Sequence, residues 1–188
     1  MINIISPPGP LRMGRKTRIE APTRARRDLF LDFLQRNKDY HLPWVHHSAD
    51  SKYYDHYLQR IKRGVTQGCF IFDQENGKLV GVVNINNILL GGICSASLGY
   101  YGDQAYKATG FMTEGMWLSL CYAVETLGLH RLEANIQPNN HASLRLVQKL
   151  GFRKEGFSPK YLRIGGIWQD HERWAILDEE IRDRHLWE

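Results

Sequence analysis

Close to residue 102 the predicted pattern changes from consecutive strands to alternating helices and strands, and this change limits the folds that the chain can adopt. Three strands are predicted before it, at residues 69–72, 79–85 and 94–101, with Asn76-Gly77 and Gly91-Gly92 between them. Asn-Gly between two apolar runs is a strong β-hairpin signal, so these strands are expected to form an antiparallel meander. After residue 102 the pattern becomes helix, strand, helix and strand, which predicts one α+β domain with a mixed central sheet.

The remaining elements follow from apolar spacing and from glycine. Apolar residues recur at helical spacing from Arg24 and again from Asp50 to Arg63, and two further helices end at Gly128 and Gly151. Other strands are expected at residues 17–21, 131–136, 152–158 and 167–177. We expect a single domain over residues 1–188, with residues 1–16 flexible and residues 178–188 forming a charged C-terminal tail.

Composition excludes several classes of protein. The 188 residues are 43% hydrophobic and 24% charged, as is typical of a globular protein in water. No apolar run approaches the roughly 20 residues that span a bilayer, so no membrane partner is expected. Cys69, Cys94 and Cys121 are widely spaced in apolar surroundings, which indicates buried thiols in a reducing compartment and predicts a cytoplasmic location.

The formal charge of +5 arises largely near the N-terminus. Three explanations are open for this basic stretch: a solvated flexible segment, a phosphate-bearing partner such as ribosomal RNA or a cofactor, and a mitochondrial transit peptide. Glu20 is the only acidic residue between positions 12 and 27. The basic residues of this stretch are Arg12, Arg15, Lys16, Arg18, Arg24, Arg26 and Arg27.

Two groups of side chains suggest sites but have simpler explanations. The histidines lack the spacing of a metal motif, so no metal is expected; they are His41, His46, His47 and His56. An aromatic group could line an acceptor cleft or could pack in the core, and it consists of Trp44, Tyr53 and Tyr54.

The segment from Lys107 to Thr113 joins the third predicted strand to an apolar helix. Ala108 and Gly110 are small enough for a ligand to approach the backbone, and the helix N-terminus offers unpaired N–H groups. Such a turn can bind an anion, and Lys107 adds a positive charge. The alternative is an ordinary loop followed by a helix that Thr113 caps.

Asn140 and Ser143 lie three residues apart at the start of the second helix. Both can therefore point into the cleft beyond the preceding strand. The amide of Asn140 is suited to hydrogen bonding with an amide of a ligand such as pantetheine. The alternative is that Asn139 or Asn140 simply caps the helix.

Glu133 lies on the strand between these two helices. Strand alternation places it on the face opposite Leu132, next to the expected site, where a carboxylate could act as a general base. The alternative is a surface ion pair with Arg131 or Lys149.

The order of these segments resembles the GNAT acetyltransferase superfamily, and especially its ribosomal-protein N-terminal acetyltransferase (RimJ/RimL-type) branch. The phosphate motif of that family reads Gln or Arg, two residues, Gly, one residue, then Gly or Ala; it falls on residues 107–112, where only Gly110 matches strictly. The run from Ala108 to Glu114 is similar to the Gly-x-Gly-Tyr-Met-Thr-Glu of the branch. Closer matches are Asn-x-Ala-Ser at residues 140–143 and Lys-Leu-Gly-Phe at residues 149–152, and Trp-Gln-Asp-His at residues 168–171 is also similar. The resemblance covers residues 17–177 and is tightest over residues 98–157.

The resemblance implies a GNAT-like fold, a mixed and mostly antiparallel sheet of about seven strands that is splayed in the middle and has helices on both faces. It also implies acetyl-CoA as cosubstrate and direct attack of an amine on the thioester, whose carbonyl a backbone N–H of the splayed strand would polarise. The residues that would hold acetyl-CoA are Leu98, Gly99, Tyr100, Tyr101, Lys107, Ala108, Thr109, Gly110, Phe111, Met112, Thr113, Asn140 and Ser143.

Three of the candidate residues would take part in catalysis. Asn140 would bind the pantetheine arm, and Ser143 would lie near the sulfur and stabilise or protonate the departing thiolate. Some relatives have a tyrosine acid where this chain has Val147, which leaves Ser143 or water as the proton donor. Glu133 is the candidate base, directly or through water.

The acceptor follows from amine basicity. An α-amine has a pKa near 8 and a lysine amine near 10.4, so their neutral fractions at pH 7 differ roughly 300-fold. A site with one candidate base therefore favours the N-terminus of a protein or peptide. The alternatives are a small-molecule amine acetyltransferase and a non-catalytic acetyl-CoA-binding or RNA-associated module; ribosome association and a homodimer are further alternatives to test.

Overall fold

The computed structural model describes residues 9–42 and 44–184. One eight-stranded sheet has the order β1-β2-β3-β4-β5-β6-β8-β7. Neighbouring strands are antiparallel except for β5 and β6, which are parallel, so the predicted mixed, mostly antiparallel sheet is confirmed. The strands are β1 (Arg12–Met13), β2 (Thr17–Glu20), β3 (Thr66–Asp73), β4 (Leu79–Leu89), β5 (Ser95–Gly102), β6 (Arg131–Ile136), β7 (Arg153–Ile164) and β8 (Ile167–Leu177).

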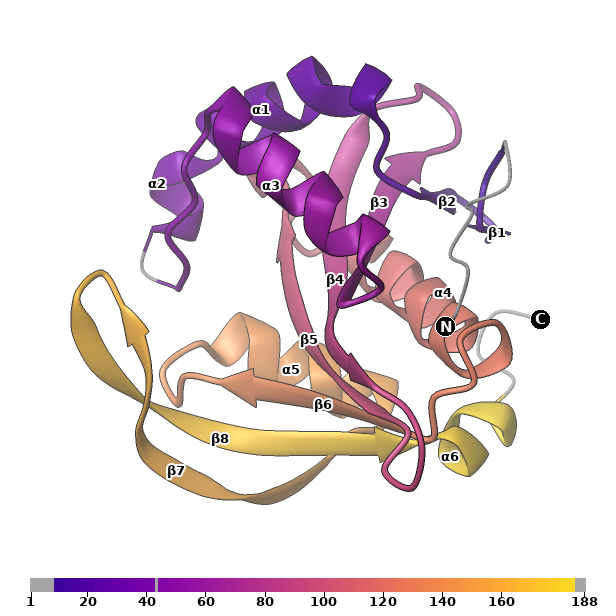
Figure 1. Ribbon diagram of the computed structural model, residues 1–188, viewed down its shortest axis with the longest axis vertical. Coiled ribbons are helices and arrows are strands. Elements are labelled where there is room, and N and C mark those ends of the chain that lie inside the picture. Colours follow the sequence, from indigo (N-terminus) through magenta and orange to yellow (C-terminus); the bar gives the residue numbers. More distant parts are fainter. Residues whose placement is uncertain (1–8, 43, 185–188) are drawn as a thin grey trace.

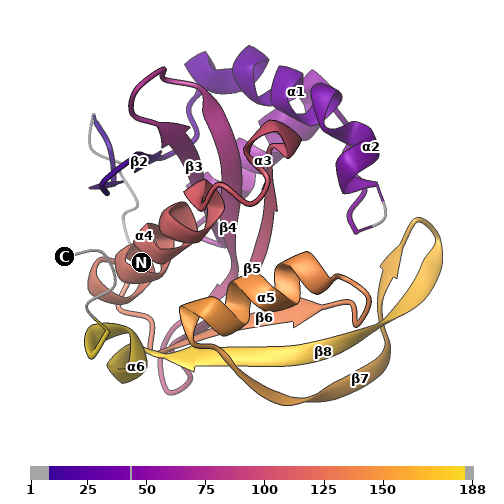
Figure 2. The same ribbon diagram turned by 180° about the vertical axis from the view of Figure 1, so that it is seen from behind.

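Helices cover both faces of the sheet, as Figures 1 and 2 show from opposite sides. On one face, α1 and α3 contribute Phe30 and Tyr54 to a core that includes Phe70 of β3. On the other face, α4 and α5 contribute Leu120 and Val147 to a larger core. The helices are η1 (Arg24–Arg26), α1 (Arg27–Arg36), α2 (Lys38–His41), α3 (Ser51–Lys62), η2 (Gln104–Tyr106), α4 (Phe111–Glu125), α5 (His141–Leu150) and α6 (Asp178–Arg182).

The two helices after residue 102 differ in how much of their surface is buried. Helix α4 is buried without interruption from Glu114 to Val124, because it packs on β2, β3 and β4 and contacts α5 and α6 as well. Helix α5 buries only Val147 and Leu150 and ends at Gly151, whose φ of 89° is the left-handed conformation that glycine adopts without strain. Among the described residues, none of the helices has the length and apolar character that crossing a membrane requires.

Residues 12–13 form strand β1, although the sequence predicts a flexible segment over residues 1–16. Arg12 pairs with Ile19 of β2, and the N–H of Gly14 donates a 2.7 Å hydrogen bond to the carbonyl of Thr17. This short hairpin adds an eighth strand to the seven or so expected, while residues 1–8 lie outside the described part of the chain.

Strands β7 and β8 form a long ribbon that extends beyond the rest of the sheet, and its turn reaches toward the α2 region (Figure 1). β7 continues past the predicted end at Ser158 to Ile164, because the register with β8 shifts between Ser158 and Leu162. Gly165 in the turn lies against His46, since a Cβ added there would be 2.7 Å from the His46 Nε2 atom. The ribbon therefore meets the segment between α2 and α3.

Candidate functional site

The sheet opens between β5 and β6. These strands pair in parallel only from Ser95 opposite Arg131 to Leu98 opposite Ala134. Beyond that point β5 continues to Gly102 paired with β4, and β6 continues paired with β8. Within the described part of the chain, one edge of β5 from residue 99 to residue 102 therefore has no strand partner, which confirms the predicted splay.

The turn between η2 and α4 has the backbone geometry that its small residues allow. Ala108 and Gly110 both have positive φ, 61° and 85°. Gly110 occupies the N-cap position of α4 and supplies no side-chain cap, and Thr113 does not take that role. Because the first N–H groups of a helix have no intrahelical partner, α4 offers these donors to a ligand at its positive end.

Lys16, from the turn between β1 and β2, lies beside the turn before α4, although the sequence pattern assigns it no individual role. Its Nζ donates a 2.6 Å hydrogen bond to the carbonyl oxygen of Thr109 and lies 4.5 Å from the centre of the Phe111 ring. A Cβ added at Gly110 would lie 3.1 Å from the same Nζ. The ammonium of Lys16 thus adds a positive charge beside the start of α4.

Glu114 holds the β1–β2 turn against α4 and so positions Lys16. Its carboxylate is 1% exposed and accepts hydrogen bonds from the backbone N–H of Arg15 at 2.7 Å and of Lys16 at 3.2 Å. It also accepts a 2.8 Å hydrogen bond from the hydroxyl of Thr17. These donors compensate the buried charge of Glu114.

At the start of α5, the two predicted polar residues have different tasks. The Asn140 Oδ1 atom accepts a 3.1 Å hydrogen bond from the N–H of Ser143, so Asn140 is the N-cap of the helix. Its amide nitrogen remains a donor on the same side chain. The Ser143 hydroxyl lies 2.5 Å from the hydroxyl of Tyr100 on β5, and this hydrogen bond bridges the opening in the sheet.

One cavity of about 580 Å³ connects the opening, the turn and the start of α5. Of the residues predicted to hold the cofactor, its lining includes Tyr100, Tyr101, Lys107, Ala108, Gly110, Met112, Thr113, Asn140 and Ser143. The predicted residues that lie outside the lining are Leu98, Gly99, Thr109, Phe111 and Glu133.

The charges around this cavity are mainly positive. Lys107, Arg145 and Lys149 belong to the lining. Asp103 is the one carboxylate residue among the described lining residues, and its Oδ2 atom lies 2.9 Å from Nη2 of Arg36. A negatively charged ligand therefore fits the cavity better than a polycation does.

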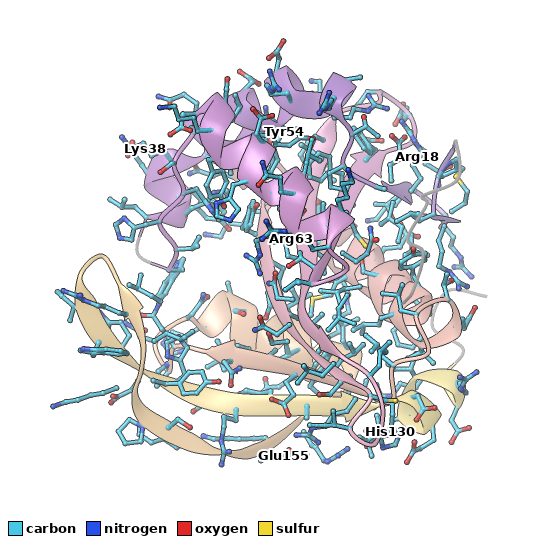
Figure 3. All side chains as sticks on the ribbon, viewed as in Figure 1. Arg18, Lys38, Tyr54, Arg63, His130 and Glu155 are labelled. Carbon is cyan, nitrogen blue, oxygen red and sulfur yellow. The ribbon has the colours of Figure 1, made fainter. Side chains whose placement is uncertain are left out.

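Glu133 lies on the other face of β6 from the α4 and α5 core. Its Oε1 atom accepts a 2.7 Å hydrogen bond from Nε of Arg131, which also pairs with Glu155 of β7, labelled in Figure 3. These two carboxylates, Glu155 first, raise the pKa of Arg131. Glu133 therefore has the ion pair that the sequence left as an alternative, and its role as a base remains a prediction.

The aromatic group divides between core and cavity. Tyr54, labelled on α3 in Figure 3, is 0% exposed and belongs to the core. Trp44 lines the cavity together with His41, whose Nε2 donates to the carbonyl of Gly102 at 2.8 Å. Burial lowers the pKa of His41, so this ring is neutral at pH 7 and its Nε2 carries the proton.

A second cavity, of about 340 Å³, adjoins the first and shares His41 and Val45 with it. It lies between α1, α2 and the segment that leads to α3. His47, in its lining, forms a 2.9 Å hydrogen bond through Nδ1 with the Tyr53 hydroxyl. Burial is the main cause that lowers the pKa of His47 to about 4, and electrostatic repulsion between its protonated ring and the rings of His41 and His46 adds to it.

Within the described residues, one histidine belongs to a group of potential metal ligands, which lies away from both cavities. His130, Asp178 and Glu179 have ligand atoms within 4.8 Å of one another. The group is at the end of β8 and the start of α6, and none of its members lines the cavity. The four histidines considered from the sequence do not belong to it.

A family model for the acetyltransferase (GNAT) domain matches residues 17–153. The chain is 35% identical over 155 residues to the probable N-acetyltransferase YjcK of Bacillus subtilis (strain 168), covering 82% of this chain and 83% of the relative. It is 32% identical over 153 residues to the ribosomal protein uS5-alanine N-acetyltransferase of Escherichia coli (strain K12), covering 77% and 79%.

Solved structures share the fold. RimJ of Mycobacterium smegmatis in complex with CoA-disulfide superposes with a TM-score of 0.80 at 24% identity, covering 92% of this chain and 87% of that chain. Spermidine N-acetyltransferase from Vibrio cholerae in complex with CoA and spermine gives a TM-score of 0.76 at 20% identity, covering 89% and 99%. At these identities the likeness establishes the common architecture.

Proposed function

The chain belongs to the GNAT family of N-acetyltransferases, and we propose that it transfers the acetyl group of acetyl-CoA to the N-terminal α-amine of a protein. The observation that carries the proposal is the single cavity that joins the α4 turn to the opening in the sheet and to Ser143. Each part of that cavity has one task in the reaction.

The turn before α4 would hold the pyrophosphate of acetyl-CoA. Support comes from the uncapped N-terminus of α4 and from the positive φ of Ala108 and Gly110, which turns the backbone toward the cavity. Lys16 and Lys107 would add positive charge on either side of this turn.

The opened edge of β5 and the start of α5 would hold the remainder of the cofactor. The amide nitrogen of Asn140 would donate to the pantetheine arm, since its oxygen already caps α5. A backbone N–H of β5 near residues 98–101 would polarise the thioester carbonyl and stabilise the negative charge that forms on its oxygen. The hydroxyl of Ser143 would stabilise or protonate the departing thiolate.

The acceptor would enter from the side of α2, where Trp44 and His41 line the cavity and the β7–β8 turn meets His46. A polyamine would need carboxylates, whereas the one carboxylate residue in the described lining, Asp103, is paired with Arg36. An α-amine has the lower pKa and is more often neutral at pH 7 than a lysine amine. The uS5-alanine relative makes a ribosomal protein the first acceptor to try.

Glu133 is our candidate for the base that removes the proton of the amine. It lies on the face of β6 opposite the α4 and α5 core, and a water molecule would connect it to the amine because it does not line the cavity.

The test is to incubate the protein with acetyl-CoA and each of four acceptors and to follow acetylation by mass spectrometry. These are a peptide with a free N-terminal alanine, the same peptide with a blocked N-terminus and one lysine, spermidine, and a ribosomal protein fraction. We expect acetylation of the free N-terminus, with the blocked peptide and spermidine at least tenfold slower. Faster acetylation of spermidine would favour the small-amine alternative, and no acetylation of any acceptor would favour the non-catalytic alternative.

A further inference from the structure

The hydrogen bond between Tyr100 and Ser143 connects two elements that the opening in the sheet separates. Tyr100 reaches across from β5, and Ser143 is in the first turn of α5, with an O···O distance of 2.5 Å. Both residues line the cavity. A second bond, from the N–H of Ser143 to Oδ1 of Asn140, fixes the backbone of Ser143 at the start of α5.

Chemistry decides which hydroxyl donates. A phenol is a stronger donor than an aliphatic alcohol, and burial raises the pKa of Tyr100, so the phenol keeps its proton over the working pH range. A serine hydroxyl has one hydrogen and two lone pairs. If Tyr100 donates to Ser143, the serine hydrogen is free to point away from Tyr100 and toward another acceptor in the cavity.

We propose that Tyr100 is a positioning residue for acetyl transfer, which orients the hydroxyl hydrogen of Ser143 toward the sulfur of bound acetyl-CoA. The inference rests on the proposed function and goes beyond it by giving Tyr100 a side-chain role, where sequence analysis gave it only a place in the cofactor site. The position of Val147, at which some relatives have a tyrosine, is 0% exposed and faces the core. Tyr100, from the facing strand β5, would take over part of the task of that tyrosine, which acts as the acid in those relatives.

The reaction balances without any further reagent. The amine nitrogen forms a bond to the acetyl carbon, the C–S bond breaks, and the sulfur takes the electron pair. Ser143 donates its hydrogen bond to this thiolate, while Tyr100 donates to Ser143 and limits the build-up of charge on the serine oxygen. The proton lost by the nitrogen equals the proton gained by the sulfur, and both hydroxyls are restored at the end.

The test is a double-mutant cycle of Tyr100→Phe and Ser143→Ala, with Tyr122→Phe on α4 as control. For each protein, kcat would be measured with acetyl-CoA and the acceptor that the wild type uses best, and the Kd for CoA by calorimetry. We expect kcat to fall about tenfold for Tyr100→Phe and about tenfold or more for Ser143→Ala, with both Kd values within about twofold of wild type. Tyr122→Phe should leave kcat unchanged.

The decisive result is the double variant. If Tyr100 acts through Ser143, adding Tyr100→Phe to Ser143→Ala should lower kcat no further. A multiplicative loss of kcat in the double variant would overturn the role of Tyr100 while leaving the proposed function intact. A higher Kd for CoA with an unchanged kcat would do the same. A wild-type protein that acetylates no amine would overturn both.

Discussion

The ammonium of Lys16 donates a 2.6 Å hydrogen bond to the carbonyl oxygen of Thr109, which fixes a residue of the β1–β2 turn beside the start of α4. Other basic residues of the N-terminal stretch form ion pairs with carboxylates: Arg12 with Glu125, and Arg18 with Glu20. Lys16 instead contacts a carbonyl and an aromatic ring at the proposed phosphate site. This placement favours the cofactor phosphates as the partner of Lys16.

Lys16→Gln should weaken CoA binding, because it removes a charge near the pyrophosphate but keeps an N–H donor for Thr109. We expect Kd to rise about three- to tenfold at low salt and less at high salt, since salt screens exposed charges. Calorimetric titrations at two salt concentrations would measure this. Lys62→Gln on α3 is the control, and an equal effect of both substitutions would argue against a role of Lys16 at the phosphates.

Glu114→Ala should destabilise the protein. It leaves the N–H groups of Arg15 and Lys16 and the hydroxyl of Thr17 without their buried acceptor. An unsatisfied buried donor costs about 1–3 kcal/mol. Thr17 is buried, whereas Arg15 and Lys16 are at least partly exposed and water can reach their N–H groups, so we expect the free energy of unfolding to fall by about 2–4 kcal/mol in total. Urea denaturation would show it, with Glu125→Ala as control, because the exposed ion pair of Glu125 with Arg12 contributes about 1 kcal/mol or less.

Ala108→Gly should stabilise the protein, which is the opposite of the usual effect of glycine. Ala108 has a φ of 61°, and a left-handed conformation costs a residue with a Cβ roughly 1–2 kcal/mol. The greater entropy of glycine in the unfolded chain offsets part of this gain, which leaves about 0.5–1 kcal/mol. Thermal unfolding would measure the change. As a control, Ala142→Gly in the exposed first turn of α5 should lower stability. A lower stability of both variants would show that the left-handed strain at Ala108 is negligible.

His47 should make stability depend on pH. Its folded-state pKa of about 4 is below the ordinary 6.5, so the unfolded state binds the proton more readily. The stability that the neutral ring contributes is therefore complete above about pH 6.5 and is lost as the pH falls toward 4. Between pH 7.5 and 5.0 the loss should be about 2 kcal/mol in urea denaturation. His47→Asn, which keeps a polar group near the Tyr53 hydroxyl, should lose less over the same range, and an identical loss would show that His47 does not titrate in this way.

Local signals in the sequence predict much of the fold. The strand at residues 131–136 has the predicted bounds, and the helix after it is followed by the predicted C-terminal Gly151, because alternation and a C-terminal glycine lie within a few residues of the element they define. The position of the cavity follows from the splay between β5 and β6, which the family resemblance implies and no local pattern gives.

The contacts that refine the site are between distant residues, and patterns do not predict them. Lys16 and Thr109 are 93 residues apart, and Tyr100 and Ser143 are 43 apart. Alternation gives the face of Glu133, but it does not decide between a base and an ion pair, because Arg131 lies two residues away on the same face.

The most direct test of the central claim is calorimetric titration of acetyl-CoA into the wild type and into Gly110→Glu, with the fold of the variant checked by thermal unfolding. Gly110 has a φ of 85° at the uncapped start of α4, so a glutamate there adds strain and a negative charge beside the proposed pyrophosphate site. We predict a Kd of about micromolar for the wild type and no measurable binding to a folded Gly110→Glu. No binding by the wild type, or equal binding by both proteins, would contradict the assignment of this turn to the cofactor.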